Sequence, residues 1–188
     1  MNRDKQYFGR SQFNNPCPPD GPAPCAKTGQ TGSDYPGDDG DLERGVEWPN
    51  PRFTDNLDGT VTDNLTGLIW LRRAHCWEYY VLDWYQSLDG ANALQSGYCG
   101  LTDGSTPGEW RMPNRIEMLS ILDMSRYNPA LPNHHPFLYV QNQYWTSTTD
   151  LVDGSKAFYV RVVDGESITY EKADPFAVMD VWPVRGGH

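Results

Sequence analysis

Bulky apolar residues follow a turn signal in the first half of the chain. The segment from 52 to 71 predicts a hairpin followed by a strand, because Asp58-Gly59 is a strong two-residue turn signal. Val61, Ile69 and Trp70 supply the bulky side chains that strands favour. We therefore expect a small antiparallel sheet in this part of the protein.

In the C-terminal third, apolar residues occupy every second position of one segment. The pattern predicts strands at 157–163, 167–170 and 178–184, with a turn at Asp164-Gly165. Because successive side chains of a strand point to opposite faces, one set should reach the core and the other should not. The core set is Phe158, Val160 and Val162, and the opposite set is Tyr159, Arg161 and Val163.

Two helices are predicted between these strands. Asp83 is a helix N-cap with Gln86 three residues later, so a helix should run over about 84–96 and stop at Gly97. Asn114 and Glu117 form the same capping pattern, which predicts a second helix over 115–123.

The first 45 residues differ from the rest of the chain. They are dense in Gly, Pro, Asp and Ser and have no apolar period, so we interpret 1–45 as an extended leader and 46–188 as the folded domain. At 188 residues, the length favours one domain over two. The 7 Trp, 11 Tyr and 6 Phe indicate a loop-rich fold whose core is made of large rings.

Charge limits the classes of partner. The formal net charge of −10 disfavours nucleic acid and heparin-like polymers, because such binding needs clustered Lys and Arg. No apolar run approaches the ~18 residues of a membrane span, and no signal peptide is visible in the polar first twenty residues.

Four cysteines allow three pairings, of which spacing favours the two local ones. These would join Cys17 to Cys25 and Cys76 to Cys99, the second bracketing the first predicted helix. Four free thiols in a cytosolic protein are the alternative. No pair has the Cys-x-x-Cys spacing of a zinc site.

Residues that invite a chemical role have simpler explanations. Asp55, Asp58 and Asp63 are close together, but their spacing does not fit a calcium loop, so we expect turn residues, no metal and no cofactor. Adjacent His134 and His135 point to opposite faces of an extended chain and cannot easily share one ion. We predict no catalytic residues and no enzyme activity.

Several other residues are expected to be structural. Trp110 is a core anchor and Pro113 directs the chain into the second helix. Arg111 is expected to form an internal ion pair rather than bind a ligand. Trp70 and Trp145 are expected in the core, and His135 in a structural turn.

Short segments rich in Trp, Gly and Asp carry a resemblance to a known family. They are 58–64 (Asp-Gly-Thr-Val-Thr-Asp-Asn), 66–70 (Thr-Gly-Leu-Ile-Trp), Trp110-Arg111-Met112-Pro113, His135-Pro136-Phe137 and Tyr144-Trp145-Thr146-Ser147-Thr148. In this order they resemble the C-terminal domain family of the Legionella collagen-like protein, over roughly residues 28 to 187. The resemblance implies an α+β, loop-rich fold similar to C-type lectins and formylglycine-generating enzymes, with two helices packed on short antiparallel sheets.

The resemblance also implies a secreted, cell-surface or periplasmic adhesin-like module that binds a glycan or a protein without catalysis. The C-terminal face is the expected site. Its residues are Tyr159, Arg161, Thr169, Glu171, Lys172, Asp174, Phe176 and Asp180. Two alternatives stay open: a structural or tip subunit of an envelope or phage-like assembly, for which a trimer would be informative, and a copper-dependent modifying enzyme.

Overall fold

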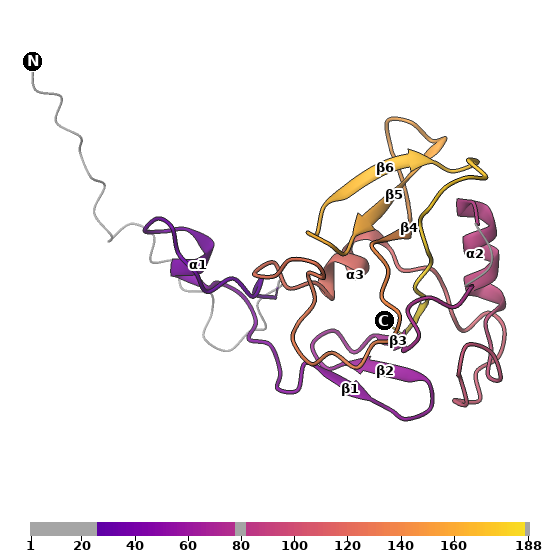
Figure 1. The fold of residues 1–188 in the computed structure, drawn as a ribbon, viewed down its shortest axis with the longest axis horizontal. Helices are drawn as coiled ribbons and strands as arrows, with labels where there is room; N and C mark the ends of the chain where they lie inside the picture. Colours follow the sequence, from indigo (N-terminus) through magenta and orange to yellow (C-terminus); the bar gives the residue numbers. More distant parts are fainter. Residues whose placement is uncertain (1–25, 78–81, 187–188) are drawn as a thin grey trace, which may run out of the picture.

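The computed structural model describes residues 26–77 and 82–186, and its elements are short (Figure 1). The helices are α1 (Asp39–Leu42), α2 (Trp84–Ala93) and α3 (Arg115–Ser120). The strands are β1 (Phe53–Asp55), β2 (Thr60–Asp63), β3 (Ile69–Leu71), β4 (Gln143–Thr149), β5 (Lys156–Arg161), β6 (Ser167–Glu171) and β7 (Val184–Arg185). A few helices and two small antiparallel sheets confirm the α+β, loop-rich class.

The first sheet has the order β1-β2-β3-β7, and all its neighbours are antiparallel. The predicted hairpin is confirmed, with the turn between β1 and β2 ending at Gly59. Gly59 has a φ of +88°, and a Cβ there would lie 2.3 Å from the carbonyl oxygen of Gly100. Only glycine meets both demands, because it tolerates positive φ and leaves room for a neighbouring backbone.

The second sheet has the order β4-β5-β6, again antiparallel. β5 and β6 confirm the strands expected at 157–163 and 167–170, whereas β4 was not predicted as a strand. The strand expected over 178–184 is wrong for most of its length, since only Val184 belongs to one. Residues before it run extended beside β4, joined by a bridge between Tyr144 and Asp180.

Both predicted helices form, and both begin at the expected capping boxes. The Asp83 side chain accepts from the Gln86 backbone N–H, and the Asn114 side chain accepts from that of Glu117. Each helix is about three residues shorter than expected, because α2 ends at Ala93 and α3 at Ser120. A third, one-turn helix, α1, is capped by Asp38 within the segment interpreted as a leader.

A large aromatic cluster fills the space between the first sheet and α3. Trp182 is at its centre, where its ring centroid lies 4.7 Å from that of Phe137, 5.1 Å from Tyr144 and 5.7 Å from Trp70. Its indole Nε1 also donates to the carbonyl of Leu71 at 2.8 Å. Beside this first cluster, the buried Arg52 and Asp63 form a bidentate ion pair at 2.9 Å.

A second cluster lies between the second sheet and α2. It is built from Trp84, Ala91, Met112, Trp145, Ala157, Ala177, Met179 and Val181, with Tyr159 packed against it. The Trp84 indole joins α2 to β4, because it donates to the carbonyl of Thr146 at 2.8 Å. Both faces of β5 are therefore covered, because Val160 belongs to the first cluster and Ala157 to the second.

The described part of the leader reaches the body through backbone contacts. Ala26 bridges to Val46, the Met124 N–H donates to the carbonyl of Thr28, and the Trp48 indole donates to the carbonyl of Lys27. The earlier part of the leader lies outside the described residues, as does the disulfide predicted between Cys17 and Cys25.

Candidate functional site

The register of the second sheet divides the residues expected on the C-terminal face. Tyr159 pairs with Ile168 and shares a face with Trp145, whose ring centroid lies 6.3 Å away. Thr169 pairs with Phe158 on the opposite face. Glu171 pairs with Lys156 on that same opposite face. These predicted site residues therefore lie on two faces of the sheet.

Two cations expected at the site make internal contacts instead. Arg161 holds Asp164 through two hydrogen bonds, one of them 3.0 Å long, and contacts Glu166 at 2.7 Å. Lys172 is buried, and its Nζ donates to Thr149 and to the carbonyl of Gly154 while lying 4.4 Å above the Trp84 ring. Both side chains fasten loops of this face.

Asp180 is also occupied within the protein. Its Oδ1 lies 2.5 Å from Nδ1 of His75, a residue that sequence reasoning had not singled out. Burial raises the pKa of Asp180, and its hydrogen bond with His75 opposes that rise. The pair joins the segment after β3 to the extended segment beside β4.

Of the two remaining residues of the predicted face, Asp174 is half-buried and Phe176 is exposed. The Tyr170 hydroxyl donates to Asp174 at 2.7 Å, and the same carboxylate accepts the Phe176 backbone N–H at 2.8 Å. This hydrogen bond with Tyr170 lowers the pKa of Asp174. Exposure is 82% for Phe176 and 70% for Val178, although Ala177 and Met179 on either side of Val178 are buried.

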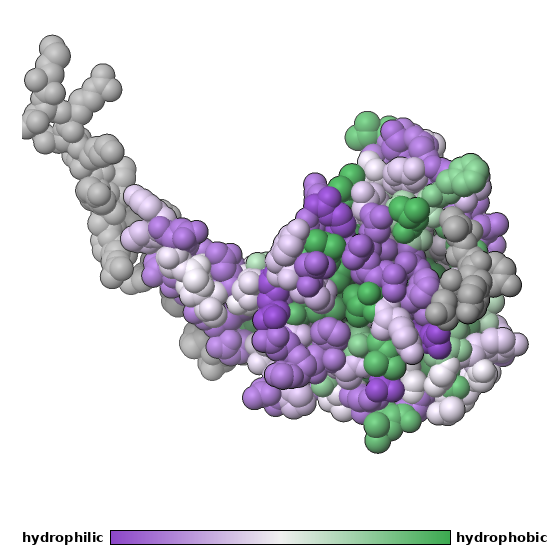
Figure 2. All heavy atoms as spheres, in the orientation of Figure 1, coloured by the Kyte–Doolittle hydropathy of each residue, from purple (hydrophilic) through white to green (hydrophobic). Residues whose placement is uncertain are grey.

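We use "apolar face" below for Tyr170, Phe176 and Val178. The loop between β4 and β5 meets the end of β6, because the Lys172 backbone N–H donates to the carbonyl of Ser155. That loop also exposes Leu151 and Val152 almost completely. Figure 2 shows hydrophobic surface over this loop and over the loop that follows β6.

The residues expected to be structural are placed as follows. Trp70, Trp110 and Trp145 are fully buried, and Pro113 is buried ahead of α3. Arg111 pairs with Glu117 through two hydrogen bonds of 2.7 and 2.6 Å and also donates to the carbonyl of Gly186. His135 packs against Phe137, and burial lowers the pKa of its imidazole.

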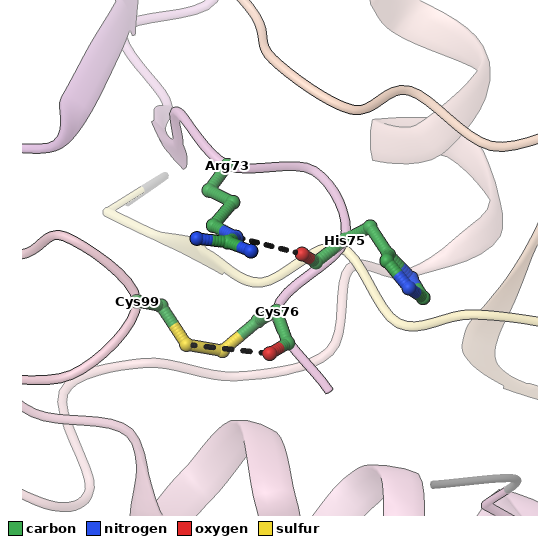
Figure 3. The surroundings of a disulfide bond; sticks show 4 residues. All are labelled: Arg73, His75, Cys76 and Cys99. Carbon is green, nitrogen blue, oxygen red and sulfur yellow. Dashed lines mark hydrogen bonds between the residues drawn. A yellow bond between two sulfur atoms is a disulfide. The ribbon is translucent and has the colours of Figure 1, made fainter. Parts of the chain in front are cut away.

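Figure 3 shows the disulfide between Cys76 and Cys99, whose Cα atoms are 5.5 Å apart. It closes the loop that carries α2, as the cysteine spacing predicted. The His75 ring points away from it, while the His75 carbonyl accepts from Arg73 at 3.2 Å. Beside the disulfide lies a mainly apolar hollow of about 310 Å³, bordered by Trp77 and Tyr98.

The aspartates of the first hairpin stabilise turns and strands. Asp55 pairs with Arg72 at 3.0 Å, Asp58 accepts from both the N–H and the hydroxyl of Thr60, and Asp63 holds Arg52. Over 26–77 and 82–186, no group of three or more His, Cys, Asp or Glu is arranged to hold a metal ion.

Sequence reasoning missed three residues that matter at this face. Tyr170 and Val178 have ordinary strand character in the sequence, and their exposure depends on how the segments around them pack. The available signal in the sequence was the position of Val178 between Ala177 and Met179, both of which are buried. His75 had no signal, because its partner Asp180 is 105 positions away in the sequence.

These observations define a disulfide-bonded, loop-rich α+β domain with two aromatic clusters and an exposed apolar face. The model of the Lcl C-terminal domain family matches residues 59–185. The chain therefore belongs to the Lcl C-terminal domain family, which confirms the resemblance seen in the sequence. Neither the curated proteins nor the solved structures contain a match. Among the described residues, no helix is long and apolar enough to cross a membrane.

Proposed function

We propose that this domain is a non-catalytic binding module that holds a protein partner at its apolar face. The observation that carries the proposal is the exposure of Phe176 and Val178 on a segment anchored by buried neighbours. Exposed apolar side chains that cluster on an ordered surface mark interaction sites, whereas single ones need no explanation. Aromatic side chains held on an ordered segment are also typical anchors of protein-binding surfaces.

The charged groups of this face favour a protein over a glycan there. Recognition of a sugar needs several unpaired donors and acceptors around a ring, because hydroxyl groups must exchange water for equivalent partners. Arg161, Lys172 and Asp180 each have internal partners. The exposed side chains of Phe176 and Val178 offer a ligand apolar contacts instead.

The edge of the second sheet adds to this support. β6 lies at the end of the strand order β4-β5-β6, and Tyr170 belongs to it. Edge strands offer backbone N–H and C=O groups to an added strand. A partner segment in extended conformation gains backbone hydrogen bonds from β6 and apolar contacts from Phe176.

We further propose that the domain acts outside the cytoplasm, at the cell surface, in the periplasm or as a secreted protein. The disulfide between Cys76 and Cys99 supports this location, since such bonds persist in oxidising compartments.

Protein and glycan arrays probed with the oxidised full chain test the function directly. We expect protein hits that survive a calcium chelator and that disappear with the double variant Phe176→Ser/Val178→Ser. Leu57→Ser is the matched control, because Leu57 is 87% exposed on the hairpin of the other sheet. Hits that persist in the double variant, or calcium-dependent glycan hits alone, would overturn the proposal.

A further inference from the structure

A polar hollow of about 630 Å³ lies on a different part of the protein from the apolar face. Its walls come from α2, from the segment 111–117 and from β4. The lining residues are Leu88, Asp89, Asn92, Arg111, Met112, Asn114, Glu117 and Ser147. Two segments singled out in the sequence, Trp110-Arg111-Met112-Pro113 and Tyr144-Trp145-Thr146-Ser147-Thr148, meet here. The volume is within the range of small-molecule sites.

The walls are held in place without a ligand. The Ser147 N–H donates to the carbonyl of Pro113 at 2.8 Å, and the Arg115 N–H donates to the Thr148 hydroxyl at 3.0 Å. These bonds fix β4 against the start of α3. On α2, Asp89 and Asn92 are three positions apart and therefore share one side of the helix. A preformed site of this kind saves the ordering cost of binding.

The hydrogen-bonding groups divide into occupied and available ones. Glu117 is occupied, because its oxygens accept from both terminal nitrogens of Arg111 and from the Asn114 N–H. In the part of the chain that the structure describes, the side chains of Asp89, Asn92 and Ser147 make no hydrogen bond. They offer a carboxylate, an amide and a hydroxyl, so donors and acceptors both face the hollow.

We infer that this hollow is a binding site for an uncharged saccharide. Such a ligand presents hydroxyl groups that donate and accept, which matches Asn92 and Ser147, and apolar C–H faces that match Leu88. An acidic sugar fits poorly. Two carboxylates, Asp89 and Glu117, line the hollow against one guanidinium, and that guanidinium is already paired.

The inference does not depend on the proposed protein-binding face, since the two sites share no residue. Loss of Phe176 and Val178 should leave saccharide binding intact, and loss of Asn92 and Ser147 should leave protein binding intact. Failure of one proposal can therefore be distinguished from failure of the other.

Amide chemical shifts of the full oxidised chain test the inference. The probes are methyl β-glucoside, methyl β-galactoside, methyl α-mannoside and N-acetylglucosamine at millimolar concentrations, where single weak sites saturate. Glucuronate is the anionic comparison. We expect at least one neutral probe to shift amides of 88–92, 111–112, 114–117 and 147 and to bind more tightly than glucuronate.

Substitutions then locate the site. Asn92→Ala and Ser147→Ala should each weaken binding of that probe by about fivefold or more, as expected for one lost hydrogen bond. Asn133→Ala is the control, because Asn133 is exposed and lies outside the hollow. Melting curves of the variants should match that of the wild type. No shift at these amides with any neutral probe, or tighter binding of glucuronate, would overturn the inference.

Discussion

The first cluster and the apolar face use aromatic residues in opposite ways. In the first cluster, Trp70, Trp182 and Tyr144 are fully buried, and the rings of Trp70 and Tyr144 both pack against that of Trp182. At the apolar face, Phe176 and Tyr170 are held by an ordered turn but remain exposed. Aromatic content alone therefore does not separate a core residue from a binding residue. What separates them is whether the surrounding segments cover the ring.

Removal of the ring at the centre of the first cluster should have the largest effect on stability. Trp182→Ala removes contacts with Phe137, Tyr144 and Trp70 together with the hydrogen bond to Leu71. We expect a loss of about 3–5 kcal/mol in the free energy of unfolding, measured by denaturant titration. Trp182→Phe should lose less, because most of the ring contacts remain. A loss of less than about 1 kcal/mol from the alanine variant would contradict the assignment of Trp182 to the core.

The disulfide between Cys76 and Cys99 packs against the first cluster and should have the next largest effect. Cys76→Ser/Cys99→Ser opens a loop with a sequence separation of 23, which carries Trp84 and Ala91 of the second cluster. Loops of this length correspond to roughly 3 kcal/mol of stability. Wild type treated with reductant should reproduce the shift in the unfolding midpoint. An unchanged midpoint for the double variant would show that the bond does not restrain the unfolded chain.

The ion pair between Arg111 and Glu117 should contribute a smaller, pH-dependent amount. Burial favours the neutral acid, but hydrogen bonds from Arg111 and from the Asn114 N–H outweigh burial and lower the pKa of Glu117. A carboxyl whose pKa is lower in the folded state stabilises the protein at any pH above its unfolded-state pKa, near 4.5. This stabilisation is lost as the pH falls through the folded-state pKa.

Glu117→Gln tests this linkage. At neutral pH we expect it to cost at most about 1 kcal/mol, because the pair is partly exposed, and the difference from wild type should shrink below pH 4.5. Asn114→Ala removes the other half of the capping box without a titrating group, so its cost should stay constant with pH. A constant difference for Glu117→Gln would argue against the lowered pKa.

Changes at the apolar face should affect stability least. Phe176→Ser/Val178→Ser replaces side chains that are already exposed, so the free energy of unfolding should change by less than about 0.5 kcal/mol. The same variant should lose its protein hits on the array. A loss of several kcal/mol would instead place Phe176 with the core residues and remove the contrast between the two regions.

Local sequence patterns predicted most of the elements. Asp83 and Asn114 marked both helix starts, because capping boxes depend on residues within one turn of each other. Asp58-Gly59 marked the first hairpin for the same reason. β4 was missed because the run Tyr144-Trp145-Thr146 has bulky or hydroxyl side chains on both faces, and both faces are buried. A strand covered on both sides shows no alternation.

The site was harder to predict than the fold. Alternation correctly separated Val160 from Tyr159, but it did not reveal that the second cluster covers the Tyr159 side. Lys172 bonds to Thr149 and Gly154, and Asp180 bonds to His75. Each of these partners lies 18 or more positions away in the sequence. Such pairings depend on how segments pack in three dimensions, and local patterns along the chain do not record them.

Hydrogen–deuterium exchange of the full chain, with and without the protein partner found on the array, tests the central claim most directly. If the partner binds the apolar face, peptides that cover 167–180 should gain protection, while peptides that cover 53–63 on the other sheet should exchange as before. Protection confined to the 53–63 hairpin, with no change over 167–180, would contradict the account.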